Sequence, residues 1–302
     1  MSPPLGTSQN PIGALGLVNL TPLMEKSRGR NEICIGLIDG PVAVNHPDLA
    51  SENIREISGK PTAACAETDS GACTHGTFVA GILHARRGSP APAICPNCTL
   101  LLRPIFGETI LARRQTLSAA PEELATAIIE IIRAGARVIN ISAALAQPST
   151  RGEKELEESL NYAARHGAIV VAAAGNQGTV GSTTITRHPW VIPVIACDQH
   201  GWPAPKSNLS HSAGGRGLAA PGERITSLGT NATTYTFGGT SAATPFVTGA
   251  IALVWSEFPA ATAADIKAAI ARARTTRRRT IVPPLLNAWA VYKAMASTHA
   301  TG

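Results

Sequence analysis

The stretch GGTSAATPFVTGAIALV, residues 238–254, places one serine between a glycine-rich turn and a run of small, mostly apolar residues. The apolar residues recur at helical spacing, so the stretch predicts a tight turn that opens into a buried helix. Ser241 would lie at the N-terminus of that helix, where unpaired backbone N–H groups and the positive end of the helix dipole meet. Pro245 is expected in the first turn, where a missing N–H is tolerated. Taken alone, Ser241 is either a helix cap or a nucleophile, and caps are commoner.

The composition is that of a globular domain with a sizeable core. Of the 302 residues, 44% are hydrophobic and 15% are charged, which excludes a disordered chain. The net charge of +6 equals the number of basic residues that cluster near the C-terminus, which are Lys267, Arg272, Arg274, Arg277, Arg278 and Arg279. Because the excess is local, we expect a solvated helix end there and no nucleic-acid partner.

The sequence shows neither a signal peptide nor a membrane span. Lys26 is the first basic residue, and several prolines interrupt the stretch before it. The longest apolar run, at about 242–255, is too short and too interrupted by threonine to cross a bilayer. We therefore expect a cytoplasmic protein without a membrane partner, and the oligomeric state stays open.

The cysteines leave several states open. Cys95 and Cys98 form a C-x-x-C pair, and Cys65 and Cys73 lie nearby in the sequence. Four thiolates could bind structural zinc, but only one of the two pairs has the usual spacing. Unconnected thiols or a local disulfide are the commoner explanation of a lone C-x-x-C. The sequence assigns neither, and we expect no metal and no cofactor.

Buried strands alternate with helices along the chain. Continuous apolar runs are typical of strands buried on both faces of a parallel sheet. Such runs occupy residues 33–38, 98–106, 136–142, 168–175 and 190–197. Helices are expected at 74–83 with Thr74 as the cap, at 121–134 and at 153–165. The alternation predicts an α/β fold with three layers, α/β/α, around a central and mostly parallel sheet.

No linker, repeat or low-complexity tract divides the chain. Residues 1–30 are expected to form a loosely ordered N-terminal lead-in with one helical stretch near 15–24. Residues 31–302 are expected to form a single domain, which is an ordinary size for a large α/β unit.

Polar residues stand where the predicted elements begin or end. Asp39, Ser142 and Asn176 follow strand ends, and His75 lies at a helix start. In folds with parallel sheets, active sites gather at the carboxyl ends of the strands. Each residue alone has a structural explanation, such as a turn aspartate or a histidine satisfied by the core. Together, in the order Asp, His, Asn and Ser, they are hard to explain by structure alone.

These segments resemble those of the subtilisin-like serine proteases. The matching stretches follow the family's order and cover roughly residues 33–271: IDG…HPDL, HGTFVAG, INIS, AAAGN, SNLS…LAAPG and GGTSAATPFVTGA. The combination of the Gly-Thr-Ser-x-Ala-x-Pro and His-Gly-Thr segments is highly specific. The resemblance implies that residues 31–302 form a subtilisin-like protease domain, a serine endopeptidase acting on peptide or protein substrates.

The resemblance also implies a role for each candidate residue. Ser241 would attack the peptide carbonyl, and His75 would take its proton and later give it to the leaving amine. Asp39 would hold the other ring nitrogen of His75 and stabilise the imidazolium. Asn176 would donate its side-chain amide to the oxyanion, beside the backbone N–H of Ser241.

A substrate pocket follows from the same resemblance. Its walls in the family correspond here to Ser142, Ala143 and Ala144 on one side and Ala173, Ala174 and Gly175 on the other, with Thr183 near the base. Small residues at these positions predict a shallow pocket for small or medium side chains. The alternative is plain sheet packing, which accounts equally well for Ala143 and Thr183.

Within the family, GPVAVNHPDL, PNCTLLLRPIF and VINISAA look most like the proteases that trim ribosomally made peptides, as in cyanobactin maturation. Asp39 and His75 are too close in sequence for the helical insertion of the macrocyclising members, so we expect hydrolysis. Processing of a ribosomal precursor peptide is the expected function. General intracellular protein degradation and an inactive peptide-binding fold are the alternatives, and the intact set of four residues argues against the second.

Two departures from secreted family members stand out. Because 38 residues precede Asp39, we expect no folded propeptide of the kind that they carry. The loop HARRGSPAPAI lacks the asparagine-rich run that holds calcium in many of them, so calcium dependence is not expected.

Overall fold

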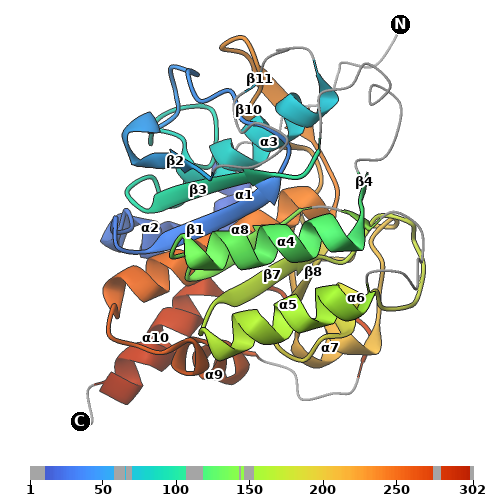
Figure 1. Ribbon diagram of the computed structural model, residues 1–302. Coiled ribbons are helices and arrows are strands. Elements are labelled where there is room, and N and C mark those ends of the chain that lie inside the picture. Colours follow the sequence, from blue (N-terminus) through green and yellow to red (C-terminus); the bar gives the residue numbers. More distant parts are fainter. Residues whose placement is uncertain are drawn as a thin grey trace, which may run out of the picture.

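A seven-stranded parallel sheet forms the centre of the molecule (Figure 1). The structure is a computed structural model that describes residues 11–57, 65, 70–106, 118–142, 144–145, 153–274 and 280–299. The strands lie in the spatial order β2 (Ile54–Glu56), β3 (Thr99–Pro104), β1 (Cys34–Asp39), β5 (Val138–Ile141), β7 (Ile169–Ala173), β8 (Ile192–Cys197) and β9 (Leu218–Pro221). Every neighbouring pair is parallel. The five predicted strands are confirmed, whereas β2 and β9 were not predicted.

Helices cover both faces of the sheet. Side chains alternate along each strand, so Leu37 joins one core with Phe246 and Ile38 joins the other with Leu156. Helices α4 (Pro121–Arg133) and α5 (Glu153–Arg165) cover one face, and α3 (Gly71–His84) and α8 (Thr240–Glu257) cover the other (Figure 1). The predicted three-layer α/β/α architecture is confirmed.

Helix α3 begins earlier than the sequence suggested. Ser70, in an extended conformation, accepts a hydrogen bond from the Cys73 N–H at 3.0 Å and caps the helix. Thr74 lies inside the helix, where its N–H donates to the Ser70 carbonyl. The prediction of Thr74 as the cap was wrong, because the serine one turn earlier satisfies the free N–H groups first.

The N-terminal segment packs against the core. It forms two helices, α1 (Pro11–Leu17) and α2 (Thr21–Lys26), in place of the single stretch predicted at 15–24. Leu20 and Leu23 are fully buried among side chains of the sheet and of α8. The division of the chain at residue 30 stays a prediction.

The remaining elements are short or peripheral. They are η1 (Ser51–Asn53), β4 (Ser118–Ala119) paired with β6 (Ala144–Leu145), α6 (Thr184–Arg187), α7 (His211–Arg216), the hairpin of β10 (Ile225–Leu228) and β11 (Thr234–Phe237), α9 (Ala263–Ala273) and α10 (Ala288–His299).

The described part of the basic cluster has structural partners. Lys267 Nζ donates to the Trp190 carbonyl at 2.6 Å and lies over the Trp190 ring. Arg274 donates to the carbonyls of Gly214 and Gly215. Solvation was therefore predicted wrongly for Lys267 and Arg274, because backbone carbonyls of the neighbouring segments lie within their reach, whereas Arg272 is exposed as predicted. Arg277, Arg278 and Arg279 lie outside the described residues.

The cysteines fall into two groups. Cys65 and Cys73 form a disulfide, while Cys95 and Cys98 are free and buried. The disulfide rules out a zinc site made of all four thiolates. Among the described residues, no group of three or more histidine, cysteine or acidic side chains is placed to hold a metal ion.

None of the described helices is both long and apolar enough to cross a membrane. Disulfides persist mainly in oxidising compartments. The Cys65–Cys73 disulfide therefore weighs against the predicted cytoplasmic location, which stays a prediction.

Candidate active site

Three strand ends bring the candidate residues to one edge of the sheet. Asp39 is the last residue of β1, and Ser142 directly follows β5, which is paired with β1. Strand β7 lies on the other side of β5, and Asn176 follows its end. Helices α3 and α8, which carry His75 and Ser241, pack against each other on one face of the sheet.

Asp39 and His75 form a short hydrogen bond. The Nδ1 atom of His75 lies 2.6 Å from Oδ1 of Asp39. Asp39 is completely buried, and the His75 side chain is 13% exposed. The carboxylate only accepts, so Nδ1 carries the proton, and the Nε2 atom of a neutral ring is left as an acceptor. Asp39 Oδ1 also accepts the Gly40 N–H at 2.6 Å.

Two glycines allow helix α3 to lie against the turn that follows Asp39. A Cβ atom on Gly40 would collide with the Ala72 carbonyl, and one on Gly76 would collide with the carbonyls of Gly40 and Pro41. This backbone-to-backbone contact brings His75 within hydrogen-bonding distance of Asp39.

We expect Gly40→Ala to lower kcat/KM by about 10²-fold, because α3 must move away from Asp39 and a displacement of roughly 1 Å has that effect on catalysis. The matched control is Gly16→Ala, since a Cβ at Gly16 has no atom within 4 Å. Steady-state kinetics on both variants test this, with thermal unfolding to verify the fold. Equal kcat/KM in the two variants would show that the close approach is not needed.

The environment of His75 shifts its pKa. Burial lowers the pKa of the imidazole, but the negative charge of Asp39 and the hydrogen bond to it raise the pKa, and the net result lies above the usual 6.5. The ring also packs against Phe237 in a T-shaped arrangement, with centroids 5.6 Å apart. Phe237 ends β11, directly before the glycine turn that leads into α8. The sequence did not single out Phe237.

Ser241 is the second residue of α8 and is only 5% exposed. The predicted position at the helix N-terminus is confirmed. Gly239, with φ of +125°, is the N-cap residue, so Ser241 is not the cap. Within the described part of the chain, no hydrogen bond joins the Ser241 hydroxyl to His75. In unliganded enzymes such bonds are often long and tighten only when substrate binds.

Pro245 lies inside α8 beyond its first turn. The prediction for this residue was wrong because the helix begins at Thr240, directly before the serine. The Ser142 hydroxyl lies 3.3 Å from the Ser241 carbonyl, the group to which residue 245 would normally donate.

Asn176 is held beside the start of α8. Its Oδ1 atom accepts the Thr240 N–H at 2.8 Å, and the Gly175 N–H donates to the Thr240 hydroxyl at 3.2 Å. Asn176 is exposed, and its Nδ2 group has no partner among the described residues. The amide is therefore fixed next to Ser241 with its donor unused.

Two buried asparagines that organise the site were missed at the sequence level. Asn208 Oδ1 accepts the N–H groups of Gln177 and Thr179, so it pins the loop that carries Asn176. Asn140, which is fully buried, donates to Ser142 Oγ at 2.7 Å. A lone asparagine inside the apolar run VINIS is the signal that was available, because a buried amide must be hydrogen-bonded.

The predicted pocket-wall residues lie at or beyond the ends of the paired strands β5 and β7, and their side chains have different surroundings. The Ser142 hydroxyl faces α8, and Ala174 packs in a small core cluster with Ile195. Thr183 caps α6 through reciprocal bonds with Thr186. Ala143 lies outside the described residues, and Ala144 belongs to β6, whose side chains are not described. The pocket role of these residues, and of Ala173 and Gly175, stays a prediction.

A cavity of about 720 Å³ opens beside Asn176. Phe237 and Gly239 line it, together with the charged residues Lys206, Glu223 and Arg224. None of the predicted pocket-wall residues whose side chains the structure describes borders it. Phe237, which lines this space, also contacts the His75 ring, whereas His75 itself does not line it.

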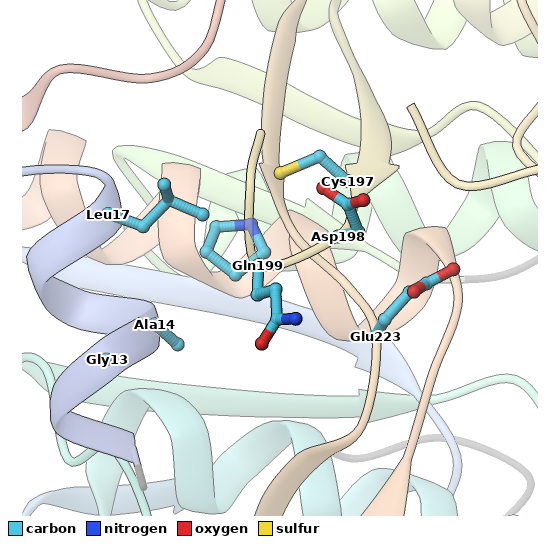
Figure 2. A pocket seen from close by; sticks show the side chains of 8 residues that line it. Gly13, Ala14, Leu17, Cys197, Asp198, Gln199 and Glu223 are labelled. Atoms are coloured by element: carbon cyan, nitrogen blue, oxygen red, sulfur yellow. The ribbon is translucent and has the colours of Figure 1, made fainter. Parts of the chain in front are cut away.

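A smaller cavity of about 300 Å³ lies between α1 and the ends of β8 and β9. Figure 2 shows Ala14 and Leu17 on the helix side and Cys197, Asp198 and Glu223 opposite them. Burial, together with the charges of Asp198 and Glu223, raises the pKa of the Cys197 thiol to about 12. The thiol therefore stays protonated near neutral pH and is not a competing nucleophile.

Comparison with known solved structures gives close matches. A mutant of the protease domain of PatA is 28% identical with a TM-score of 0.81, covering 89% of this chain and 97% of that chain. The prenylagaramide maturation protease PagA is 27% identical with a TM-score of 0.78, covering 92% and 98%.

Sequence comparison agrees with the structural matches. Thermitase from Thermoactinomyces vulgaris is 32% identical over 239 residues, which are 78% of this chain and 78% of thermitase. Subtilisin DY from Bacillus licheniformis is 30% identical over 247 residues, 80% and 82% of the two chains. The profile of peptidase S8, described as the subtilase family, matches residues 30–285. The chain therefore belongs to the subtilase family and is a serine endopeptidase.

Proposed function

We propose that the chain hydrolyses peptide bonds with Ser241 as nucleophile, His75 as general base and acid, and Asp39 as the residue that orients the imidazole. The observation that carries this proposal is the 2.6 Å hydrogen bond between buried Asp39 and His75 Nδ1. That bond leaves Nε2 free to accept a proton, which is the state a general base requires.

The reaction would proceed in two halves. His75 Nε2 takes the Ser241 proton as the oxygen attacks the carbonyl carbon of the peptide bond, and the charged imidazole then protonates the leaving amine. Water attacks the resulting ester with His75 again as base, which releases the acid and restores Ser241. The negative charge of Asp39 stabilises the imidazolium in both halves, in agreement with the raised pKa of His75.

Asn176 would stabilise the oxyanion. Its Nδ2 group is unused among the described residues, and the bond from the Thr240 N–H fixes its orientation at 2.8 Å. We expect Asn176→Ala to lower kcat by about 10²–10³-fold with KM little changed, because the donor acts on charge that develops only in the transition state. The control is Asn31→Ala, since Asn31 is an exposed asparagine before the start of β1, at the opposite end of the strand from Asp39. A normal kcat for Asn176→Ala would remove Asn176 from the mechanism.

The pH dependence should follow His75. Only the neutral ring accepts the Ser241 proton, so kcat/KM should rise with pH and reach half its maximum above 6.5, where the pKa of His75 lies. In Asp39→Asn the charge that raises this pKa is gone while burial still lowers it, so the midpoint should move to lower pH. A profile of kcat/KM across roughly pH 5–9 measures both midpoints. A midpoint at or below pH 6.5 in the unaltered enzyme would contradict the assignment of the pH dependence to a His75 with a raised pKa.

We further propose that the substrate is a ribosomal precursor peptide. The support is that two similar solved proteins are named maturation proteases, for patellamide and prenylagaramide. The similarity to thermitase and subtilisin DY gives general protein degradation as the alternative.

Incubation of a peptide mixture from a whole cell extract with the protein, followed by mass spectrometry, separates the two functions. The Ser241→Ala variant, which lacks the proposed nucleophile, is the negative control. Repeated cleavage within one narrow sequence supports a maturation protease and gives its recognition motif. Broad cleavage would overturn the precursor assignment and favour degradation.

A further inference from the structure

Pro245 leaves a gap in the hydrogen-bond ladder of α8 at the residue of the nucleophile. In an α-helix, the N–H of residue 245 would donate to the carbonyl of residue 241, and proline has no N–H. Ser241 is 5% exposed, so water has little access to this carbonyl. A buried carbonyl without a partner is costly, although the Ala242 N–H of the same peptide unit donates to the Gly239 carbonyl at 3.1 Å.

The Ser142 hydroxyl fills this gap from outside the helix. Its Oγ atom lies 3.3 Å from the Ser241 carbonyl oxygen. Asn140 Nδ2 donates to the same Oγ at 2.7 Å. Because the hydroxyl accepts from Asn140, its own proton is available for the Ser241 carbonyl. Ser142 is itself buried, at 7% exposed.

The same helix holds Asn140 in place. Thr248, one helical turn beyond Pro245, donates its hydroxyl to Asn140 Oδ1 at 2.9 Å. Asn140 and Thr248 are both completely buried. The chain of bonds therefore starts and ends on α8 and passes through strand β5, and the Thr248 hydroxyl lies closer to Asn140 Oδ1 than to the Thr244 carbonyl, which is 3.3 Å away.

This network links Ser241 to the strand that neighbours Asp39. Asn140 is paired with Leu37 in the register between β5 and β1, and β1 ends at Asp39. The contact between the Ser142 hydroxyl and the Ser241 carbonyl thus helps to set the position of Ser241 relative to Asp39 and His75, in addition to the packing of α8.

We infer that Ser142 is a positioning residue, whose hydroxyl replaces the missing Pro245 N–H and holds Ser241 in place for attack. The inference rests on the proposed function of Ser241. It gives the Ser142 side chain a task different from the pocket wall predicted from the sequence. A wall residue affects substrate binding and KM, whereas a residue that orients the nucleophile affects kcat.

A double-mutant cycle on Ser142 and Pro245 tests the inference. Ser142→Ala is expected to lower kcat about tenfold with KM within about twofold, the effect of one lost bond to a buried acceptor. Pro245→Ala restores an N–H to the helix, so adding Ser142→Ala in that background should change kcat by less than about twofold. Ser142→Cys keeps a weaker donor and should give an intermediate kcat.

The control is Ser159→Ala, since Ser159 is another buried serine that donates to a backbone carbonyl, on α5 across the sheet. It should leave kcat unchanged. Thermal unfolding of each variant verifies the fold. A rise in KM with kcat intact in Ser142→Ala, or an equal loss of kcat in both Pro245 backgrounds, would overturn the inference.

The rate of labelling by a fluorophosphonate separates this inference from the proposed function. If the unaltered protein labels at Ser241 and Ser142→Ala labels at the same rate, only the role of Ser142 is wrong. If the unaltered protein neither cleaves peptides nor labels, the proposed function fails and the positioning role fails with it. Slower labelling of Ser142→Ala, restored by Pro245→Ala, supports the inference.

Discussion

Replacing Ser241 with alanine is expected to lower kcat by about 10⁶-fold, the loss typical when the nucleophile of a serine protease is removed. Alanine keeps the small volume that this buried helix start requires, so the fold should be preserved while the attacking oxygen is absent. Residual cleavage should come only from binding and from the oxyanion donors, about 10³–10⁴-fold above the uncatalysed rate. Single-turnover and steady-state assays with a cleaved peptide measure the loss.

The matched control is Ser256→Ala near the other end of the same helix. Ser256 is fully buried, and its hydroxyl donates to the Ala252 carbonyl. The control should alter stability but not kcat. If Ser241→Ala keeps more than a small part of the activity, another group is the nucleophile and the proposed mechanism is wrong.

Asp39→Asn is expected to lower kcat by about 10⁴-fold near neutral pH. An asparagine in this position donates its N–H to His75 Nδ1, which moves the ring proton to Nε2. The nitrogen that faces the nucleophile then donates and no longer accepts. The substituted side chain has nearly the same volume, so the packing of α3 against the turn at Gly40 should persist.

Asp48→Asn is the control for the loss of a carboxylate charge in the same part of the chain, and it should leave kcat nearly unchanged. Kinetics and thermal unfolding on both variants provide the comparison. A loss below about tenfold in Asp39→Asn would show that the 2.6 Å bond to His75 is structural and not part of the reaction.

Local sequence patterns predicted the main strands and helices of the fold. The continuous apolar run at 33–38 identified β1 and placed Asp39 at its end, because a strand buried on both faces leaves no polar position until it emerges from the sheet. The helix at 153–165 agrees with α5, whose acidic first turn and final Arg165 match the helix dipole. The same patterns placed Ser241 at the start of α8.

Contacts between distant segments could not be predicted in this way. Ser142 bonds to the Ser241 carbonyl, and Asn208 holds the loop of Asn176, although neither pair is close in sequence. Whether a buried polar group finds a partner depends on the packing of the whole sheet edge. The disulfide between Cys65 and Cys73 could not be predicted either. A disulfide requires a suitable distance between the two Cα atoms, and the spacing of the cysteines in the sequence does not determine that distance.

Labelling with a fluorophosphonate tests the central claim most directly, because the reagent reacts with a serine that is activated by a neighbouring base. The protein is labelled, digested, and the modified peptide is identified by mass spectrometry, with Ser241→Ala and Asp39→Asn treated in parallel. The account predicts one modified residue, Ser241, no label in Ser241→Ala, and much slower labelling in Asp39→Asn. Labelling at another serine, or none in the unaltered protein, would contradict it.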